Sequence, residues 1–138
     1  MSKASKKSLL ALYWRTANAF AGRARQQLGE AVHSVVLYGS VARDTAAEDS
    51  DIDVLVLSEN SEAVRNELVG ISESLDFENN YDTFLIATCL TPERLMELAR
   101  GEFPIARHIF REGVVLYDDG TFERIRKDAV AVGGGNVG

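Results

Sequence analysis

Two apolar segments joined by a polar connection constrain the fold of this chain more than any other feature. Residues 32–38 (VHSVVLY) and 52–57 (IDVLVL) are rich in β-branched residues, which predicts two strands. The dipeptide at 39–40, Gly-Ser, ends the first strand abruptly, and the polar residues 41–50 predict a short helix and then a loop. Beyond its second residue the later segment is apolar on both faces, so we expect it to be a central, buried strand.

Helices are expected around these strands. Apolar residues recur at steps of three and four along several segments, and Thr91-Pro92-Glu93 has the composition of a helix start. Helices are predicted at residues 6–29, 61–75, 91–101, 104–113 and 121–132, with further strands at 82–88 and 114–117. The sequence therefore predicts an α/β fold, with a small mixed β-sheet and flanking helices.

The length of 138 residues and the apolar fraction of 46% suit one compact domain. We expect residues 1–132 to form it, and residues 133–138, rich in glycine and without a packing pattern, to be unstructured. No apolar run approaches the roughly 18 to 20 residues that a membrane crossing needs. The lone Cys89 excludes an internal disulfide and fits the reducing cytoplasm, where we expect the protein to reside.

Charge is distributed unevenly along the chain, whose net charge is −6. Residues 1–27 carry six bases and no acid, whereas residues 44–82 carry twelve acids and a single base, Arg65. An acidic middle argues against a nucleic-acid partner, because phosphate backbones are bound by clustered basic groups. It suits a site that concentrates metal cations, which can in turn hold a polyphosphate.

The candidate chemistry lies at the two ends of the polar connection. A strand that ends in Gly39-Ser40 and turns into a helix points backbone N–H groups outward, which suits a phosphate, and Arg43 can add a charged donor. Asp51 and Asp53 are two residues apart at the start of a strand, so their carboxylates emerge on one face. Two carboxylates that close repel each other unless a cation lies between them, and Mg²⁺ prefers such oxygen ligands.

Gly39-Ser40, ten intervening residues and Asp51-Ile52-Asp53 resemble the signature of the nucleotidyltransferase superfamily that includes DNA polymerase β, and specifically its minimal nucleotidyltransferase branch. The close resemblance covers residues 34–58, and residues 109–117 look like the family's closing helix, turn and strand. The resemblance implies a polymerase β-like nucleotidyltransferase core.

The resemblance also implies roles for individual residues. Asp51 and Asp53 match the catalytic carboxylates that hold two Mg²⁺ ions, and Gly39 and Ser40 match the turn that binds the triphosphate of a nucleotide such as ATP. Members of the family transfer a nucleoside monophosphate to a hydroxyl group and release pyrophosphate.

A third carboxylate on a neighbouring strand commonly completes the metal site in the family. Asp82, at the head of the strand predicted at 82–88, is our candidate for this third catalytic and metal-binding residue, with Glu78 as the alternative. The chain departs from the family at Asp44, where a glycine is common. Aspartate tolerates left-handed backbone better than most residues, so we expect the turn to survive.

Members of the minimal branch often resemble the antitoxin that pairs with a helical HEPN-type toxin. The resemblance implies that such an antitoxin adenylylates a tyrosine hydroxyl of its toxin. The short chain favours such a protein acceptor, since little remains for a second substrate-binding domain. The basic residues Lys6, Lys7, Arg15, Arg23 and Arg25 are one candidate docking surface. Transfer to a small molecule such as an aminoglycoside, and neutralisation of a toxin by binding alone, are the alternatives. The sequence leaves the base preference and any homo-oligomer open.

Overall fold

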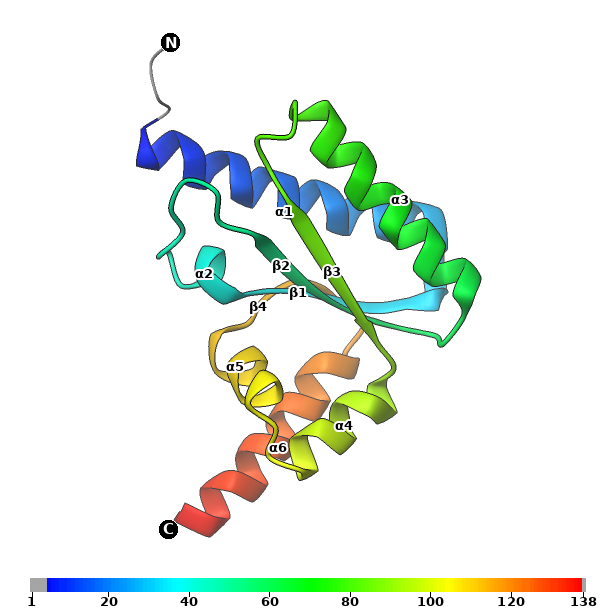
Figure 1. The fold of residues 1–138 in the computed structure, drawn as a ribbon. Helices are drawn as coiled ribbons and strands as arrows, with labels where there is room; N and C mark the ends of the chain where they lie inside the picture. The colour runs from blue at the N-terminus through cyan, green and yellow to red at the C-terminus, as the bar shows by residue number, and fades with distance from the viewer. Residues whose placement is uncertain (1–4, 138) are drawn as a thin grey trace.

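Within residues 5–137, which the computed structural model describes, a four-stranded mixed sheet forms the centre of the molecule (Figure 1). The strands are β1 (Val32–Tyr38), β2 (Ile52–Ser58), β3 (Leu85–Leu90) and β4 (Val114–Asp118), in the spatial order β3-β2-β1-β4. β1 runs antiparallel to both β2 and β4, whereas β2 and β3 are parallel. The predicted mixed α/β fold is confirmed.

Helices cover both faces of the sheet (Figure 1). One face packs against α1 (Lys6–Leu28) and α3 (Glu62–Glu78), and the other against α4 (Pro92–Arg100), α5 (Pro104–Glu112) and α6 (Thr121–Val137). The remaining helical segments are the short α2 (Gly39–Ala42) and a 3₁₀ turn at Gly29–Ala31. Both β1 and β2 are almost wholly buried, because each lies between two strands and two helical layers.

Local sequence signals set several element boundaries. The hydroxyl of Thr91 accepts a hydrogen bond from the backbone N–H of Arg94, as expected of the helix cap at the start of α4, and Pro92 occupies the first helical position. Ser61 caps α3 in the same way. No helix among residues 5–137 combines the length and the apolar character needed to cross a membrane.

Several boundaries differ from the sequence-based expectation, and two of these differences matter most here. β3 begins at Leu85, three residues later than predicted, because residues 79–82 form a turn that continues from α3. Helix α6 runs to Val137, past residue 133, where the sequence predicted an unstructured tail. Side chains beyond Ala129 and the whole of Gly138 lie outside the described residues.

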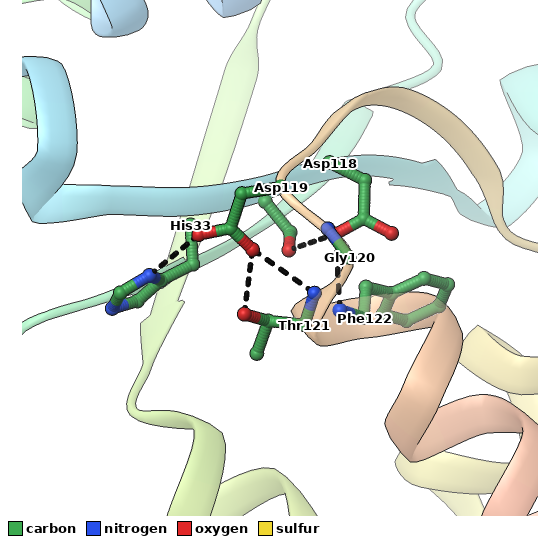
Figure 2. A network of polar contacts seen from close by, with 7 residues as sticks. His33, Asp118, Asp119, Gly120, Thr121 and Phe122 are labelled. Atoms are coloured by element: carbon green, nitrogen blue, oxygen red, sulfur yellow. Dashed lines mark hydrogen bonds and ion pairs between the residues drawn. The ribbon is translucent and has the colours of Figure 1, made fainter.

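A polar network ties the start of α6 to β1 (Figure 2). The Asp118 carboxylate accepts hydrogen bonds from the Ser34 hydroxyl at 2.7 Å and from the Phe122 backbone N–H at 3.0 Å. The Asp119 carboxylate accepts from both the backbone N–H and the hydroxyl of Thr121, and lies 2.9 Å from the ring nitrogen Nδ1 of His33. The two aspartates thus cap α6 and hold it against the sheet.

Asp119→Ala is expected to lower the free energy of unfolding by about 1 kcal/mol at pH 7, the usual cost of losing a helix cap. Burial raises the pKa of Asp119, but hydrogen bonds from Thr121 and His33 outweigh it and leave the pKa below its ordinary value. A lowered carboxyl pKa stabilises the fold above the unfolded pKa, near 3.9, and this contribution is lost as the pH falls through the folded value. Urea unfolding at pH 7 and pH 3 should show that the variant loses less unfolding free energy, relative to the wild-type chain, at pH 3 than at pH 7.

The control is Asp128→Ala, which removes an exposed carboxylate further along the same helix. The loss of unfolding free energy in this control variant should be small at both pH values. A deficit in Asp119→Ala that is equal at pH 7 and pH 3 would contradict the role given to the Asp119 charge.

Candidate active site

A glycine-dependent turn brings the end of β1 against the start of β2. Gly39 has φ of 80°, a left-handed conformation that favours glycine. A Cβ atom placed on Gly39 would lie 2.5 Å from the carboxylate oxygen Oδ2 of Asp53, which is the residue opposite Tyr38 in the sheet. Only glycine therefore allows the turn and the carboxylate to lie this close together.

The turn is closed by its own backbone. The N–H of Arg43 donates to the carbonyl of Gly39 at 3.1 Å, and the N–H of Thr45 donates to the carbonyl of Ser40 at 2.9 Å. Asp44 has φ of 58°, so the left-handed conformation expected at this departure from the family pattern is present. An aspartate replaces the usual glycine here without opening the turn.

Asp51 and Asp53 lie side by side at the entrance of β2, as their spacing predicts. Asp51 is exposed and Asp53 is half-buried. Burial, together with repulsion from the Asp51 carboxylate, raises the pKa of Asp53, and the Arg43 guanidinium opposes this only in part. An oxygen pair of this kind fits Mg²⁺, which proteins commonly hold with one or two carboxylates and the phosphates of a substrate.

Arg43 does not point freely toward a phosphate. Its guanidinium donates to the Glu112 carboxylate, at the end of α5, over 2.8 Å. Glu112 is largely buried, with 17% of its side chain exposed, whereas Arg43 retains 44%. The ion pair fixes α5 beside the turn, and Arg43 contributes positive charge to the site from that position.

Neither candidate for a third carboxylate joins the pair. Asp82 is exposed in the turn before β3, and among the described residues no group of three or more acidic, histidine or cysteine side chains is close enough together to hold a metal ion. Both oxygens of Glu78 accept hydrogen bonds from Arg23, at 2.7 and 2.8 Å, in an ion pair between α3 and α1. The β3 residue that pairs with Asp53 is Ile86. The structure thus groups two carboxylates where the sequence predicted three.

The proposed basic docking surface is also partly engaged within the chain. Besides the Arg23–Glu78 pair, the guanidinium of Arg25 stacks 3.8 Å above the ring centroid of Tyr117. These two arginines fasten α1 to α3 and β4, so they contribute less to a surface for a partner than the sequence suggested.

Sequence reasoning missed a buried acid that organises the approach to β3. The Asp76 carboxylate, 7% exposed, accepts from the hydroxyl of Thr83 at 2.7 Å and from the backbone N–H of Leu85 at 3.1 Å. Asn79 donates to the hydroxyls of both Thr83 and Thr16 at 3.1 Å. The one sign of this role in the sequence is that the acid directly follows Leu75, the last apolar position of a helical stripe.

Comparisons with known proteins assign this arrangement to a family. The model of the polymerase β nucleotidyltransferase domain matches residues 24–121, more than two thirds of the chain. The chain belongs to this nucleotidyltransferase family. The matched segment includes the Gly39–Ser40 turn and both Asp51 and Asp53. A relative in Methanocaldococcus jannaschii, the candidate protein adenylyltransferase MJ1305, is 44% identical over 41 residues, which are 30% of this chain and 28% of that protein.

Solved toxin–antitoxin structures share the fold. A toxin–antitoxin crystal structure with AMP-PNP matches with a TM-score of 0.53 and 17% identity, over 83% of this chain and 85% of that one. A substituted form of the toxin–antitoxin MntA-HpeT matches with a TM-score of 0.54 and 14% identity, over the same shares. At these identities the likeness concerns the fold, and it agrees with the mixed sheet described above.

Proposed function

We propose that this nucleotidyltransferase transfers AMP from ATP to a hydroxyl group on a protein partner, a tyrosine of a HEPN-type toxin, and acts as its antitoxin. The proposal depends above all on the contact between the Gly39–Ser40 turn and the Asp53 carboxylate. The turn that would bind the triphosphate approaches one of the two carboxylates that would hold Mg²⁺, which supports the proposal. The names of the similar proteins, one an adenylyltransferase and others toxin–antitoxin pairs, support the choice of AMP and of a protein acceptor.

Each residue has a definite task in this proposal. The turn at Gly39 and Ser40 orients the triphosphate, and Asp51 and Asp53 hold Mg²⁺, which when bound neutralises charge on the phosphates. The acceptor oxygen attacks the α-phosphorus, and the bond from that phosphorus to the bridging oxygen breaks. Pyrophosphate leaves, and the hydroxyl proton passes to water. The Arg43 guanidinium acts on the Asp53 carboxylate, while its ion pair with Glu112 positions α5.

One observation favours a second candidate, neutralisation of a partner by binding alone. The residue beside Asp53 on β3 is Ile86, so no carboxylate stands there to take the proton of an acceptor hydroxyl. A protein with a weakened catalytic site can still form a stable complex.

The test is incubation of the chain with ATP, Mg²⁺ and a HEPN-type protein from the same genome, followed by mass spectrometry. We expect the mass of the partner to rise by AMP groups on tyrosine, and the Asp51→Asn variant to add none. If the partner gains no mass and Asp51→Asn still neutralises it, the binding function is correct. If only small hydroxylated compounds gain AMP, the acceptor is a small molecule.

A further inference from the structure

Exposed aromatic side chains gather at the turn that leads into β3. Phe77, Tyr81 and Phe84 have exposed fractions of 68%, 72% and 61%, and the rings of Phe77 and Tyr81 meet edge to face with centroids 6.1 Å apart. We call these three residues the aromatic turn. Large aromatic rings are costly to leave in water, and when they cluster on a surface they mark a site of interaction.

The aromatic turn is held in a strained conformation by buried polar contacts. Asn80 and Tyr81 have φ values of 53° and 60°, and a bulky residue such as tyrosine rarely adopts this left-handed backbone. The Tyr81 N–H donates to the carbonyl of Asp76 at 2.8 Å, and the Asp76 carboxylate fixes Thr83 and Leu85 on the other side of the turn. The ring of Tyr81 is thus presented to solvent by a rigid support, which lowers the entropy cost of binding.

Within the aromatic turn, Phe84 lies next to the aspartate pair. The N–H of Ile52 donates to the carbonyl of Phe84 at 2.9 Å, so Phe84 runs alongside Asp51 just before β2 and β3 begin to pair. Phe84 is two residues before Ile86, which pairs with Asp53, and side chains two apart on a strand share a face. Leu85, between them, faces the core under α1 and α3. Phe84 therefore faces the same side of the sheet as the Asp53 carboxylate.

The strand order separates the two reactants of the proposed transfer. The Gly39–Ser40 turn follows β1, on one side of β2, and the aromatic turn precedes β3, on the other side (Figure 1). In phosphoryl transfer the attacking and leaving oxygens lie roughly in line through phosphorus. If pyrophosphate leaves on the β1 side, the acceptor oxygen must approach over β3.

We propose that the aromatic turn docks the protein that supplies the acceptor hydroxyl, an inference that rests on the proposed function. The charges around the aromatic turn indicate which kind of partner segment would bind there. Residues 76–84 and 44–51 hold acids and no base, and Glu48, Asp49 and Asp82 are exposed beside the path to the metal-binding pair. The acceptor segment that complements this surface carries apolar and basic side chains around its hydroxyl residue.

The variant for the test is Tyr81→Asn with Phe84→Ser. Asparagine adopts left-handed backbone more readily than tyrosine, and both rings are exposed, so the unfolding temperature should equal or exceed that of the wild-type chain. The matched control is Phe103→Ser, which removes a ring that is 52% exposed at the start of α5, whereas the other end of α5 contacts the site through Glu112.

The experiment measures three quantities with an inactive HEPN-type protein of the same genome as the probe: its dissociation constant, kcat/KM for AMP transfer to it, and the dissociation constant of ATP with Mg²⁺. We expect the double variant to lose about tenfold or more in affinity for the probe and in kcat/KM, as removal of central aromatic contacts does, with ATP affinity within about twofold of wild type. Phe103→Ser should match wild type in all three.

Unchanged affinity and kcat/KM in the double variant would overturn the inference. Weaker ATP binding with an unchanged KM for the probe would assign the rings to the nucleotide base instead, and a change confined to self-association would assign them to a second copy of the chain. If the wild-type chain binds the probe without transferring AMP, the proposed catalysis fails but the affinity comparison still decides the docking surface. If it neither binds nor transfers, both are wrong.

Discussion

Asp53→Asn is expected to reduce nucleotide transfer by about a thousandfold or more, and to raise the unfolding temperature of the metal-free protein. In the proposed mechanism Asp53 holds Mg²⁺, and a metal ion at the transferred phosphate supplies several kcal/mol of charge stabilisation. Each 1.4 kcal/mol is about tenfold in rate, so the loss of activity follows. The gain in stability follows because burial and the neighbouring Asp51 carboxylate raise the pKa of Asp53 and so disfavour its charged form in the folded state.

The stability gain of Asp53→Asn should depend on pH in a defined direction. A raised carboxyl pKa costs stability at a pH above the folded value, and the cost disappears below the unfolded pKa near 3.9. The stabilisation of Asp53→Asn should therefore be present at pH 7 and vanish near pH 3. Mg²⁺ should raise the unfolding temperature of the wild-type chain far more than that of the variant, because in the proposed mechanism the ion binds the folded carboxylate pair. Full transfer activity in Asp53→Asn would refute the metal site.

Gly39→Ala is expected to destabilise the chain by about 1 to 3 kcal/mol and to reduce transfer by at least about a hundredfold. The strain of a non-glycine residue at φ of 80° accounts for part of the stability loss, and the contact of the new Cβ with Asp53 Oδ2 accounts for the rest. Relief of that contact must move either the turn or the carboxylate, and small displacements of catalytic groups are costly to rate. Urea unfolding and a single-turnover transfer assay measure the two effects.

The matched control is Gly22→Ala. Gly22 lies inside α1, and a Cβ there meets no atom within 4 Å. Alanine favours helix over glycine by about 1 kcal/mol, so this variant should gain stability and keep its activity. If Gly39→Ala behaved like Gly22→Ala, the close approach of the turn to Asp53 would have no functional importance.

The amino-acid sequence by itself determined the parts of the site that depend on neighbours along the chain. β1 has the predicted bounds and β2 the predicted start, because each segment is rich in apolar and β-branched residues and is bounded by polar residues or a turn signal. The left-handed turn at Gly39 and the tolerance of Asp44 for the same backbone region were both readable from residue type. The spacing of Asp51 and Asp53 placed both at the entrance of one strand.

Only the tertiary structure decided which side chains from distant segments meet. The parallel pairing of β2 with β3 depends on how α3 packs and where the Asp76 network ends its turn, so it set Ile86, and not Asp82, beside Asp53. Long-range ion pairs likewise join Glu78 to Arg23 and Arg43 to Glu112. Strand register and charge pairing are decided by the burial of whole elements against one another, which no local window of sequence contains.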